Sequence, residues 1–393
     1  MSGLPRLSDL PAEIIEIAGK LESAGFETWC VGGALRDRLL DHPSEDVDLA
    51  TAARPEQVMQ LFPRTVAVGV RFGTVGVLDR RGVLHEVTTF RKDIATDGRH
   101  AVVEYGASLE EDLARRDFTI NALAYHPLRH EWRDPFEGSE DLRRRRVRAV
   151  GDPARRFAED YLRILRALRF AARFEFAIDP ATWKAARAGA SGLDGLSAER
   201  VREEWFKGLE TACSLAFLIT LWRDSGAAGV WVPELGGEYP FASEAPSPRD
   251  PVVLTAGLCR DPATVLQRLR ASNAEIDRAR AMGRALAEPP SSDPVAVRRW
   301  LAEVSDAADD LILLAEYRSG SRPRWAEAVA GIRARGEPVS RAELAVTGDD
   351  LRAAGVPAGP EMGRLLGRLL DAALEDPALN SKERLLELVR AWR

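Results

Sequence analysis

The feature that most constrains the fold is a change of pattern near residue 140. Before it, short runs rich in Val and Thr with glycine between them, such as VAVGV, TVGVLD and VLHEVTTF, predict a meander or hairpin. After it, strand signals stop, and an Ala-, Leu- and Arg-rich sequence follows with apolar residues at helical spacing. The sequence therefore predicts an α+β part with a small mixed β-sheet and helices, followed by an all-helical part.

Four segments carry more detailed expectations. The polar, glycine-containing residues 91–107 predict a mobile loop, whereas 159–174 predicts one regular helix with Leu162, Leu165 and Leu168 on one face. Residues 108–125 predict a helix whose first turn is closed by a capping box of Ser108 and Glu111. The segment 9–24 predicts an amphipathic helix.

Composition limits the classes of protein. A chain of 393 residues is long enough for two or more domains. The first 20 residues show no signal-peptide pattern, and the most apolar run, 215–222, is far shorter than the roughly 20 residues that span a bilayer. The three cysteines fit no metal-ligand spacing, so we expect a soluble protein of the reducing cytoplasm without a membrane partner.

Charge is unevenly distributed. The net charge is −6, yet residues 141–173 hold 11 arginines against 4 acidic residues. A basic segment inside an acidic protein favours a polyanionic partner, and a solvated helix face is the alternative.

The stretch VGGALRDRLLDHPSEDVDLAT, residues 31–51, holds the candidate chemistry. On a strand, Asp46 and Asp48 would point to the same face, and two converging carboxylates favour a cation such as Mg²⁺ between them. A glycine turn at Gly32 and Gly33 would let backbone N–H groups approach phosphate oxygens, and Arg36 would grip a triphosphate. An ordinary turn followed by a half-buried strand explains each feature taken alone.

This stretch resembles the first motif of the DNA polymerase beta-like nucleotidyltransferases, and more narrowly of the class II tRNA nucleotidyltransferases (CCA-adding enzymes) and the bacterial poly(A) polymerases. RFGTV at 71–75, HEVTTFR at 85–91, RRDFTINALAY at 115–125, RRFAEDYLRILRALRF at 155–170 and ERVREEW at 199–205 resemble further motifs in the expected order. TGDDLRAAGVPAGPEMGRLL at 347–366 is similar to the tail of some members. The resemblance implies a catalytic head (1–140), a neck that reads the base (141–206), a helical body (207–295) and a tRNA-binding tail (296–393).

The resemblance also implies site residues. Asp46 and Asp48 would hold two Mg²⁺ ions, and Glu86 is a weaker third candidate that a structural Glu–Arg pair explains equally well. The residues implied to bind the nucleotide are Gly32, Gly33 and Arg36 at the triphosphate, Arg116, Asp117 and Asn121 near the ribose, and Asp160, Arg163, Arg166 and Arg169.

Base choice can also be argued from chemistry. Asp160 and Arg163 are spaced i, i+3, which makes them neighbours on a helix. An ionised Asp accepts from the exocyclic amine of cytosine or adenine while Arg donates to the ring nitrogen, and uracil and guanine present the opposite order. A surface salt bridge is the alternative. Arg169 lies half a turn away from Asp160, so we expect it to serve phosphates, RNA or packing.

Together these motifs predict addition of C, C and A to the 3′ end of tRNA from CTP and ATP. Addition of CC alone or A alone, poly(A) synthesis, and a non-catalytic RNA-binding protein with a degenerate head are the alternatives. The arginine run Arg143, Arg144, Arg145 and Arg146 would contact RNA phosphates, or would form a solvated connection. The sequence leaves open the oligomeric state and the switch from C to A.

Overall fold

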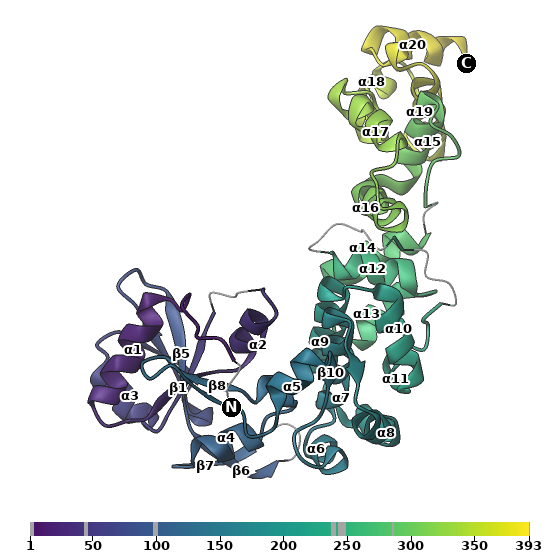
Figure 1. The fold of residues 1–393 in the computed structure, drawn as a ribbon. Helices are drawn as coiled ribbons and strands as arrows, with labels where there is room; N and C mark the ends of the chain where they lie inside the picture. The colour runs from purple at the N-terminus through teal and green to yellow at the C-terminus, as the bar shows by residue number, and fades with distance from the viewer. Residues whose placement is uncertain are drawn as a thin grey trace. The chain divides into compact units, whose positions relative to one another are not determined.

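The computed structural model describes residues 4–42, 46–96, 101–236, 241–242, 249–284 and 287–392. Contacts divide the chain into two compact units, Met1–Pro233 and Glu234–Arg393 (Figure 1). The first unit contains the β-sheet and the candidate site. The four-part division expected from the sequence stays a prediction.

A seven-stranded mixed sheet forms the centre of the first unit, in the order β3-β4-β5-β2-β1-β8-β9. Only β2 and β5 pair in parallel, and the other neighbours are antiparallel. The expected mixed sheet is therefore confirmed. Its strands are β1 (Thr28–Val31), β2 (Asp48–Thr51), β3 (Thr65–Gly69), β4 (Thr74–Leu78), β5 (Leu84–Thr89), β8 (Ala124–His126) and β9 (Glu131–Arg133).

Two helices cover one face of this sheet. Helix α1 (Ala12–Ser23) matches the amphipathic segment and buries Ile14, Ile17 and Leu21, and α3 (Pro55–Leu61) packs beside it (Figure 1). Burying apolar side chains from both layers removes them from water and stabilises the pair of layers. Helix α2 (Gly33–Leu39) follows β1 directly and begins at the double glycine.

The segment 91–107 was expected to be a loop, and this prediction was wrong. Arg91–Thr96 and Ala101–Tyr105 form strands β6 and β7 of an antiparallel hairpin, with Arg91 opposite Tyr105. Residues 97–100, with the sequence DGR at 97–99, lie outside the described residues. A polar composition misled the prediction because ladder hydrogen bonds join backbone groups, whatever the side chains are.

The helix predicted over 108–125 is much shorter. Its capping box is confirmed, because the Glu111 N–H donates to Ser108 Oγ and the Ser108 N–H donates to the Glu111 carboxylate, but α4 ends at Ala114 (Leu109–Ala114). Asp117 then accepts from the N–H of Phe118 and from the Asn121 amide, at 2.8 and 3.0 Å. These local bonds compete with a helix and produce a short 3₁₀ turn, η2 (Thr119–Asn121).

Beyond residue 140 the first unit is helical, as predicted, except for one pair of two-residue strands, β10 (Arg146–Val147) and β11 (Ala177–Ile178). The helix predicted over 159–174 is interrupted. Asp160 is extended, with φ −160° and ψ 104°, and it separates two helices. The helices of this part are α5 (Gly138–Arg143), α6 (Pro153–Glu159), α7 (Leu162–Phe174), α8 (Pro180–Ala188), α9 (Ala198–Thr211), α10 (Leu215–Asp224) and α11 (Ala227–Trp231).

The described residues of the second unit form helices and short 3₁₀ turns. The α-helices are α12 (Pro251–Leu258), α13 (Pro262–Arg268), α14 (Asn273–Arg284), α15 (Pro294–Val304), α16 (Ala308–Ser319), α17 (Trp325–Ala334), α18 (Gly348–Ala353), α19 (Pro360–Glu375) and α20 (Lys382–Ala391).

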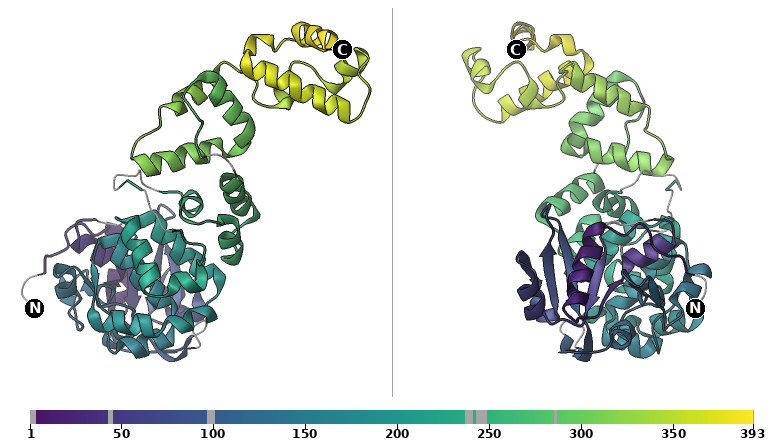
Figure 2. Two further views of the ribbon diagram at one scale, coloured as in Figure 1. Left: turned by 90° about the vertical axis from the view of Figure 1, so that its right-hand side faces the viewer. Right: turned by 60° about the vertical axis from the view of Figure 1, so that its left-hand side comes forward.

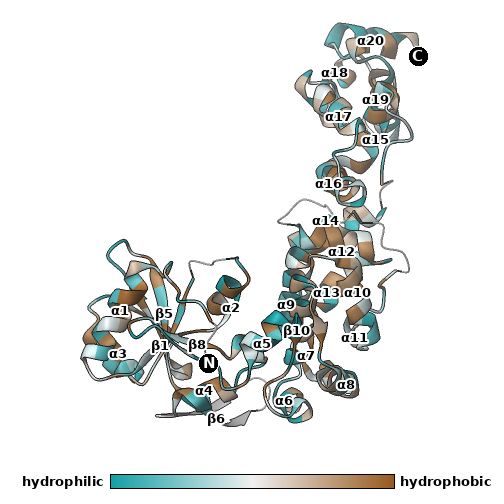
Figure 3. Cartoon of the chain, viewed as in Figure 1, coloured by the Kyte–Doolittle hydropathy of each residue, from teal (hydrophilic) through white to brown (hydrophobic). Residues whose placement is uncertain are grey.

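The last three helices enclose a small core around Leu351, Leu369 and Leu385 (Figure 2). Hydrophobic and hydrophilic residues alternate along the helices of this unit (Figure 3), as expected of helices with one buried side. Within the described residues, none of the helices combines the length and the apolar character that crossing a membrane requires.

Candidate active site

A cavity of about 870 Å³ in the first unit gathers the predicted nucleotide-site residues. Nine arginines and one lysine line it together with four aspartates, so the site suits a polyanion that carries its own cations. The predicted residues in its lining are Gly32, Gly33, Arg36, Asp46, Asp48, Arg116, Asp117, Asn121, Asp160, Arg163, Arg166 and Arg169.

Sequence reasoning missed part of the lining. Three of the missed arginines belong to motifs that were recognised without assigning these residues: Arg91 closes HEVTTFR, Arg115 opens RRD, and Arg200 belongs to ERVREEW. A motif therefore gave the right segment but not every side chain that faces the cavity. The other missed lining residues are Leu162, Phe170, Arg173 and Lys207.

The double glycine and the aspartate pair lie against each other. Val31 pairs with Asp48 across β1 and β2, and Gly32, the next residue, adopts φ 84°. A Cβ at Gly32 would lie 3.2 Å from Asp48 Oδ2 and 3.4 Å from Arg116 Nη1. Glycine is required here by both the positive φ and this close approach.

The aspartates converge as expected from their spacing, since Val47 between them is buried and both line the cavity. The pKa of Asp48 is raised to about 6: burial raises it most, the negative charges of Asp46 and Glu86 also raise it, and Arg116 lowers it. Leu49 pairs with Val87, which places Asp48 beside Glu86 on adjacent parallel strands. Mutual repulsion of this kind is relieved by a cation.

The possible metal ligands are two or three carboxylates: Asp46 and Asp48 at the start of β2, and Glu86 on the neighbouring strand β5. These carboxylates fit a divalent ion that completes its shell with water and substrate phosphate oxygens. Among the described residues, no group of three or more His, Cys, Asp or Glu side chains is arranged so that it would hold a metal by itself. Glu86 does not line the cavity, and its metal role stays a prediction.

Asp117 is buried and ionised. Burial by itself would raise its pKa, but the Arg166 charge and the hydrogen bonds from Asn121, Arg166 and the Phe118 N–H hold the pKa at about 2. The Arg166 Nε donates to Asp117 Oδ2 at 2.7 Å. This ion pair fixes Asp117 against α7 at the side of the cavity.

Arg116 lines the cavity and has one buried donor without a protein partner in the described part of the chain. Its Nη2 lies 3.3 Å from Asp112 Oδ2 and its Nη1 donates to the Asn121 carbonyl at 3.3 Å. Its buried Nε has no hydrogen-bond partner among the described residues. Since an unpaired buried donor is costly, an acceptor on a bound ligand would stabilise it.

The Asp160–Arg163 pair differs from the predicted arrangement. The two residues are not i, i+3 on one helix, because Asp160 lies in the break before α7, and their side chains bind other partners. Asp160 Oδ2 accepts from Arg200 at 2.6 Å, whereas Arg163 Nη1 donates to Glu159 at 2.7 Å. Both side chains still line the cavity. The surface salt bridge between them, the alternative explanation of their spacing, is absent from this structure.

Arg169 is bound within the protein. Its Nε donates to Glu204 Oε2 at 2.6 Å, and both side chains are buried. The argument that separated it from Asp160 assumed one regular helix, which the break at Asp160 rules out, and because Arg169 lines the cavity its nucleotide role stays a prediction.

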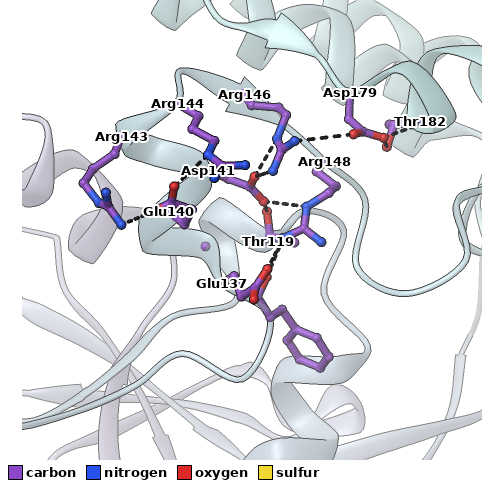
Figure 4. Close-up of polar contacts among 12 residues, drawn as sticks. Thr119, Glu137, Glu140, Asp141, Arg143, Arg144, Arg146, Arg148, Asp179 and Thr182 are labelled. Carbon is purple, nitrogen blue, oxygen red and sulfur yellow. Dashed lines mark hydrogen bonds and ion pairs between the residues drawn. The ribbon is translucent and has the colours of Figure 1, made fainter. Parts of the chain in front are cut away.

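Arginines of the basic run at 143–146 form ion pairs with nearby carboxylates of the protein (Figure 4). Arg143 and Arg144 pair with Glu140, and Arg146 Nε donates to the fully buried Asp141 at 2.7 Å. Thr119 and Arg148 bind the same carboxylate (Figure 4). Arg143, Arg144 and Arg145 are exposed, so an RNA role there stays a prediction, while Arg146 joins η2 to β10 through Asp141.

Three family models match this chain. The poly A polymerase head domain matches residues 28–148, a probable RNA- and SrmB-binding site of polymerase A matches 175–236, and a putative domain 2 of tRNA nucleotidyltransferases matches 252–389.

Curated relatives match this chain over its full length or over about half of it. A CCA-adding enzyme of Limosilactobacillus fermentum is 34% identical over 97% of this chain and 98% of its own length. A CCA-adding enzyme of Leuconostoc mesenteroides is 48% identical, and the chain spans about half the length of that relative in the match, 51%.

Solved structures of CCA-adding enzymes also match the fold of this chain. The crystal structure of the Bacillus stearothermophilus CCA-adding enzyme in complex with CTP is 32% identical with a TM-score of 0.80, and 98% of each chain is covered. The Thermotoga maritima CCA-adding enzyme complexed with tRNA shares the fold, with a TM-score of 0.67 at 19% identity over 97% of this chain and 95% of that one. With a relative above 30% identity along the whole chain and its site motifs gathered in one cavity, this chain belongs to the CCA-adding enzyme family of nucleotidyltransferases.

Proposed function

We propose that this enzyme adds C, C and A in turn to the 3′ end of tRNA, using CTP and ATP and releasing pyrophosphate. The observation that carries the proposal is the single cavity where the carboxylate pair, the RRD residues and the Asp160–Arg163 pair all meet. We also propose that the reaction takes place in the cytoplasm. The three cysteines are free, as expected there, and two of them are buried.

Asp46 and Asp48, with Glu86 as the weaker third candidate, would hold Mg²⁺. When bound there, such ions would help to deprotonate the terminal RNA hydroxyl and neutralise the leaving pyrophosphate. The position of Asp48 beside Asp46 and Glu86 supports the assignment, because after burial these two negative charges are the next causes that raise the pKa of Asp48, and a cation would relieve their repulsion.

The protein's own groups orient the nucleotide. Backbone at Gly32 and Gly33 offers close approach for phosphate oxygens, and the unpaired Nε of Arg116 offers a donor near the sugar beside Asp117. Asp160 accepts from the amine of cytosine or adenine and Arg163 donates to the ring nitrogen. Both must exchange a present partner, Arg200 or Glu159, for the base.

The tRNA partner is proposed to bind the helical second unit as well as the cavity. The match of residues 252–389 to a tRNA nucleotidyltransferase domain supports this role for the predicted body and tail. A degenerate, non-catalytic head would be expected to have lost the aspartate pair or the RRD residues. Both are intact here and line the cavity, which counts against that alternative.

One experiment tests the product. Transfer RNA lacking its 3′ CCA is incubated with the enzyme, Mg²⁺ and CTP, ATP or both, and the products are sequenced. Addition of CCA with both nucleotides and of CC with CTP alone supports the proposal. Addition of CC alone, of A alone or of a long A tail would select the corresponding alternative, and no addition would refute it.

A further inference from the structure

Protein partners bind three of the five N–H groups of the Arg36 guanidinium. Arg36 is 4% exposed, and its Nε and Nη2 lie 2.8 and 2.7 Å from Asp37 Oδ1. Its Nη1 donates to Asn121 Oδ1. Two N–H groups remain, but the side chain is so deeply buried that it is poorly placed to grip a triphosphate by itself. The expected role of Arg36 in phosphate binding therefore does not explain why this residue lies at the site, and another role has to be found.

Two aromatic rings of α7 hold the same guanidinium. Its carbon lies 5.0 Å from the ring centre of Phe170 and 4.8 Å from that of Phe174. The rings are i, i+4 on the helix and nearly parallel, with an interplanar angle of 8°. Arg173 of α7 adds an ion pair at 3.2 Å to Asp37. Helix α2 is thus attached to α7 through contacts that an arginine can make and a smaller cation would make less well.

These contacts close into a circuit, which we define as Arg36, Asn121, Asp117, Arg166 and Phe170. From Arg36 the hydrogen bonds run to Asn121, on to Asp117 at 3.0 Å, and back to α7 through Arg166 at 2.7 Å. The Arg166 guanidinium lies 5.4 Å from the Phe170 ring, which also contacts Arg36. The circuit joins α2, η2 and α7, three segments far apart in sequence.

We propose that Arg36 is a positioning residue. Phe174, which lies outside the cavity, helps to hold the Arg36 side chain in place. Held against the two rings, Arg36 fixes the orientation of the Asn121 amide, which fixes one oxygen of Asp117. This inference rests on the proposed function, in which Asp117 lies at the ribose of the incoming nucleotide. Phe174 is half-buried and does not line the cavity, so it affects the nucleotide only through the lining residues that its ring contacts. These are Arg36, Arg173 and Phe170, and the Arg36 contact is isolated by combining changes at Arg36 and Phe174.

Phe174→Leu tests the proposal, because it removes the ring while keeping an apolar side chain. We expect kcat/KM for ATP to fall by about tenfold, a change between the values of an exposed and of a desolvated cation–π contact, as suits a half-buried ring. The preference for ATP over 2′-deoxy-ATP should fall with it. The preference for ATP over GTP should stay unchanged, since Asp160 and Arg163 are outside the circuit. Phe174→Tyr retains the ring and should restore both values.

Phe176→Leu is the matched control. Phe176 lies two residues away, is 2% exposed and contacts the Phe174 ring, and no cation stacks on it within the described residues. A general loss of stability would therefore affect this variant at least as strongly, without changing the ATP to 2′-deoxy-ATP ratio. An unchanged ratio in Phe174→Leu, or an equal change in Phe176→Leu, would overturn the positioning role.

A second measurement does not depend on activity. Arg36→Met, Phe174→Leu and the double variant are compared by the urea concentration at half-unfolding. Because both changes remove the same contact, the double variant should shift the midpoint by clearly less than the sum of the single shifts. Additive shifts would overturn the positioning role of Arg36, whether or not the enzyme adds nucleotides. A wild-type enzyme that added no nucleotide would refute only the proposed function.

Discussion

Asp117→Asn tests whether an ionised, buried carboxylate holds the sugar side of the cavity in place. Asp117 is 8% exposed and accepts from the Phe118 N–H, from Asn121 and from Arg166. Asparagine has one oxygen for the first two donors, and it then presents its own NH₂ group to the Arg166 guanidinium. The variant thus loses the ion pair and gains a contact between two donors.

The size of the effect follows from the pKa. The carboxyl titrates at about 2 in the folded protein against an ordinary 3.8, and one pKa unit is about 1.4 kcal/mol, so its ionised form contributes about 2 kcal/mol of stability. Because the folded pKa is lowered, this stability is fully present above the unfolded value of 3.8 and is lost as pH falls towards 2. We therefore expect Asn to cost about 2 kcal/mol at neutral pH.

Urea unfolding of wild type and variant between pH 5 and pH 8 measures this cost. The difference in unfolding free energy should stay constant over that range, since it lies above both pKa values. Asp152→Asn is the control, because Asp152 is an exposed helix cap that asparagine replaces with little loss. A variant as stable as wild type at pH 7, or a difference that disappears between pH 8 and pH 5, would show that Asp117 is not held as an ion.

Three further changes address other parts of the site. Asp48→Ala should abolish nucleotide addition in a primer-extension assay while filter binding of tRNA survives, and near-normal turnover would contradict the metal assignment. Asp160→Ala should weaken selection against UTP and GTP by the worth of one mismatched polar pair, about 1–3 kcal/mol, and unchanged selectivity would contradict its base-reading role. Asp141→Ala leaves Arg146 and Arg148 without their buried acceptor (Figure 4). It should lower the unfolding free energy by about 3 kcal/mol in urea titration, and a loss under about 1 kcal/mol would contradict a structural role.

Local patterns predicted much of the architecture correctly. The change near residue 140, helix α1 and the capping box of α4 depend on contacts within a few residues, and these are encoded in the sequence nearby. The hairpin at 91–105 was missed because its pairing partners are backbone groups, which composition does not report. The break at Asp160 was missed because helical spacing continues across it in the sequence.

The candidate site divides in a similar way. The sequence by itself determined which residue types meet at one site, since the glycine turn, the aspartate pair and the arginine-rich motifs carry a chemistry that any fold of this family has to assemble. Only the tertiary structure decided what each charge is used for. Arg36 is bound by Phe170 and Phe174 from α7, and Arg146 is bound by Asp141. An arginine in a sequence has the same charge whether it faces a ligand or a buried carboxylate, and the partner is chosen by segments that meet only when the chain has folded.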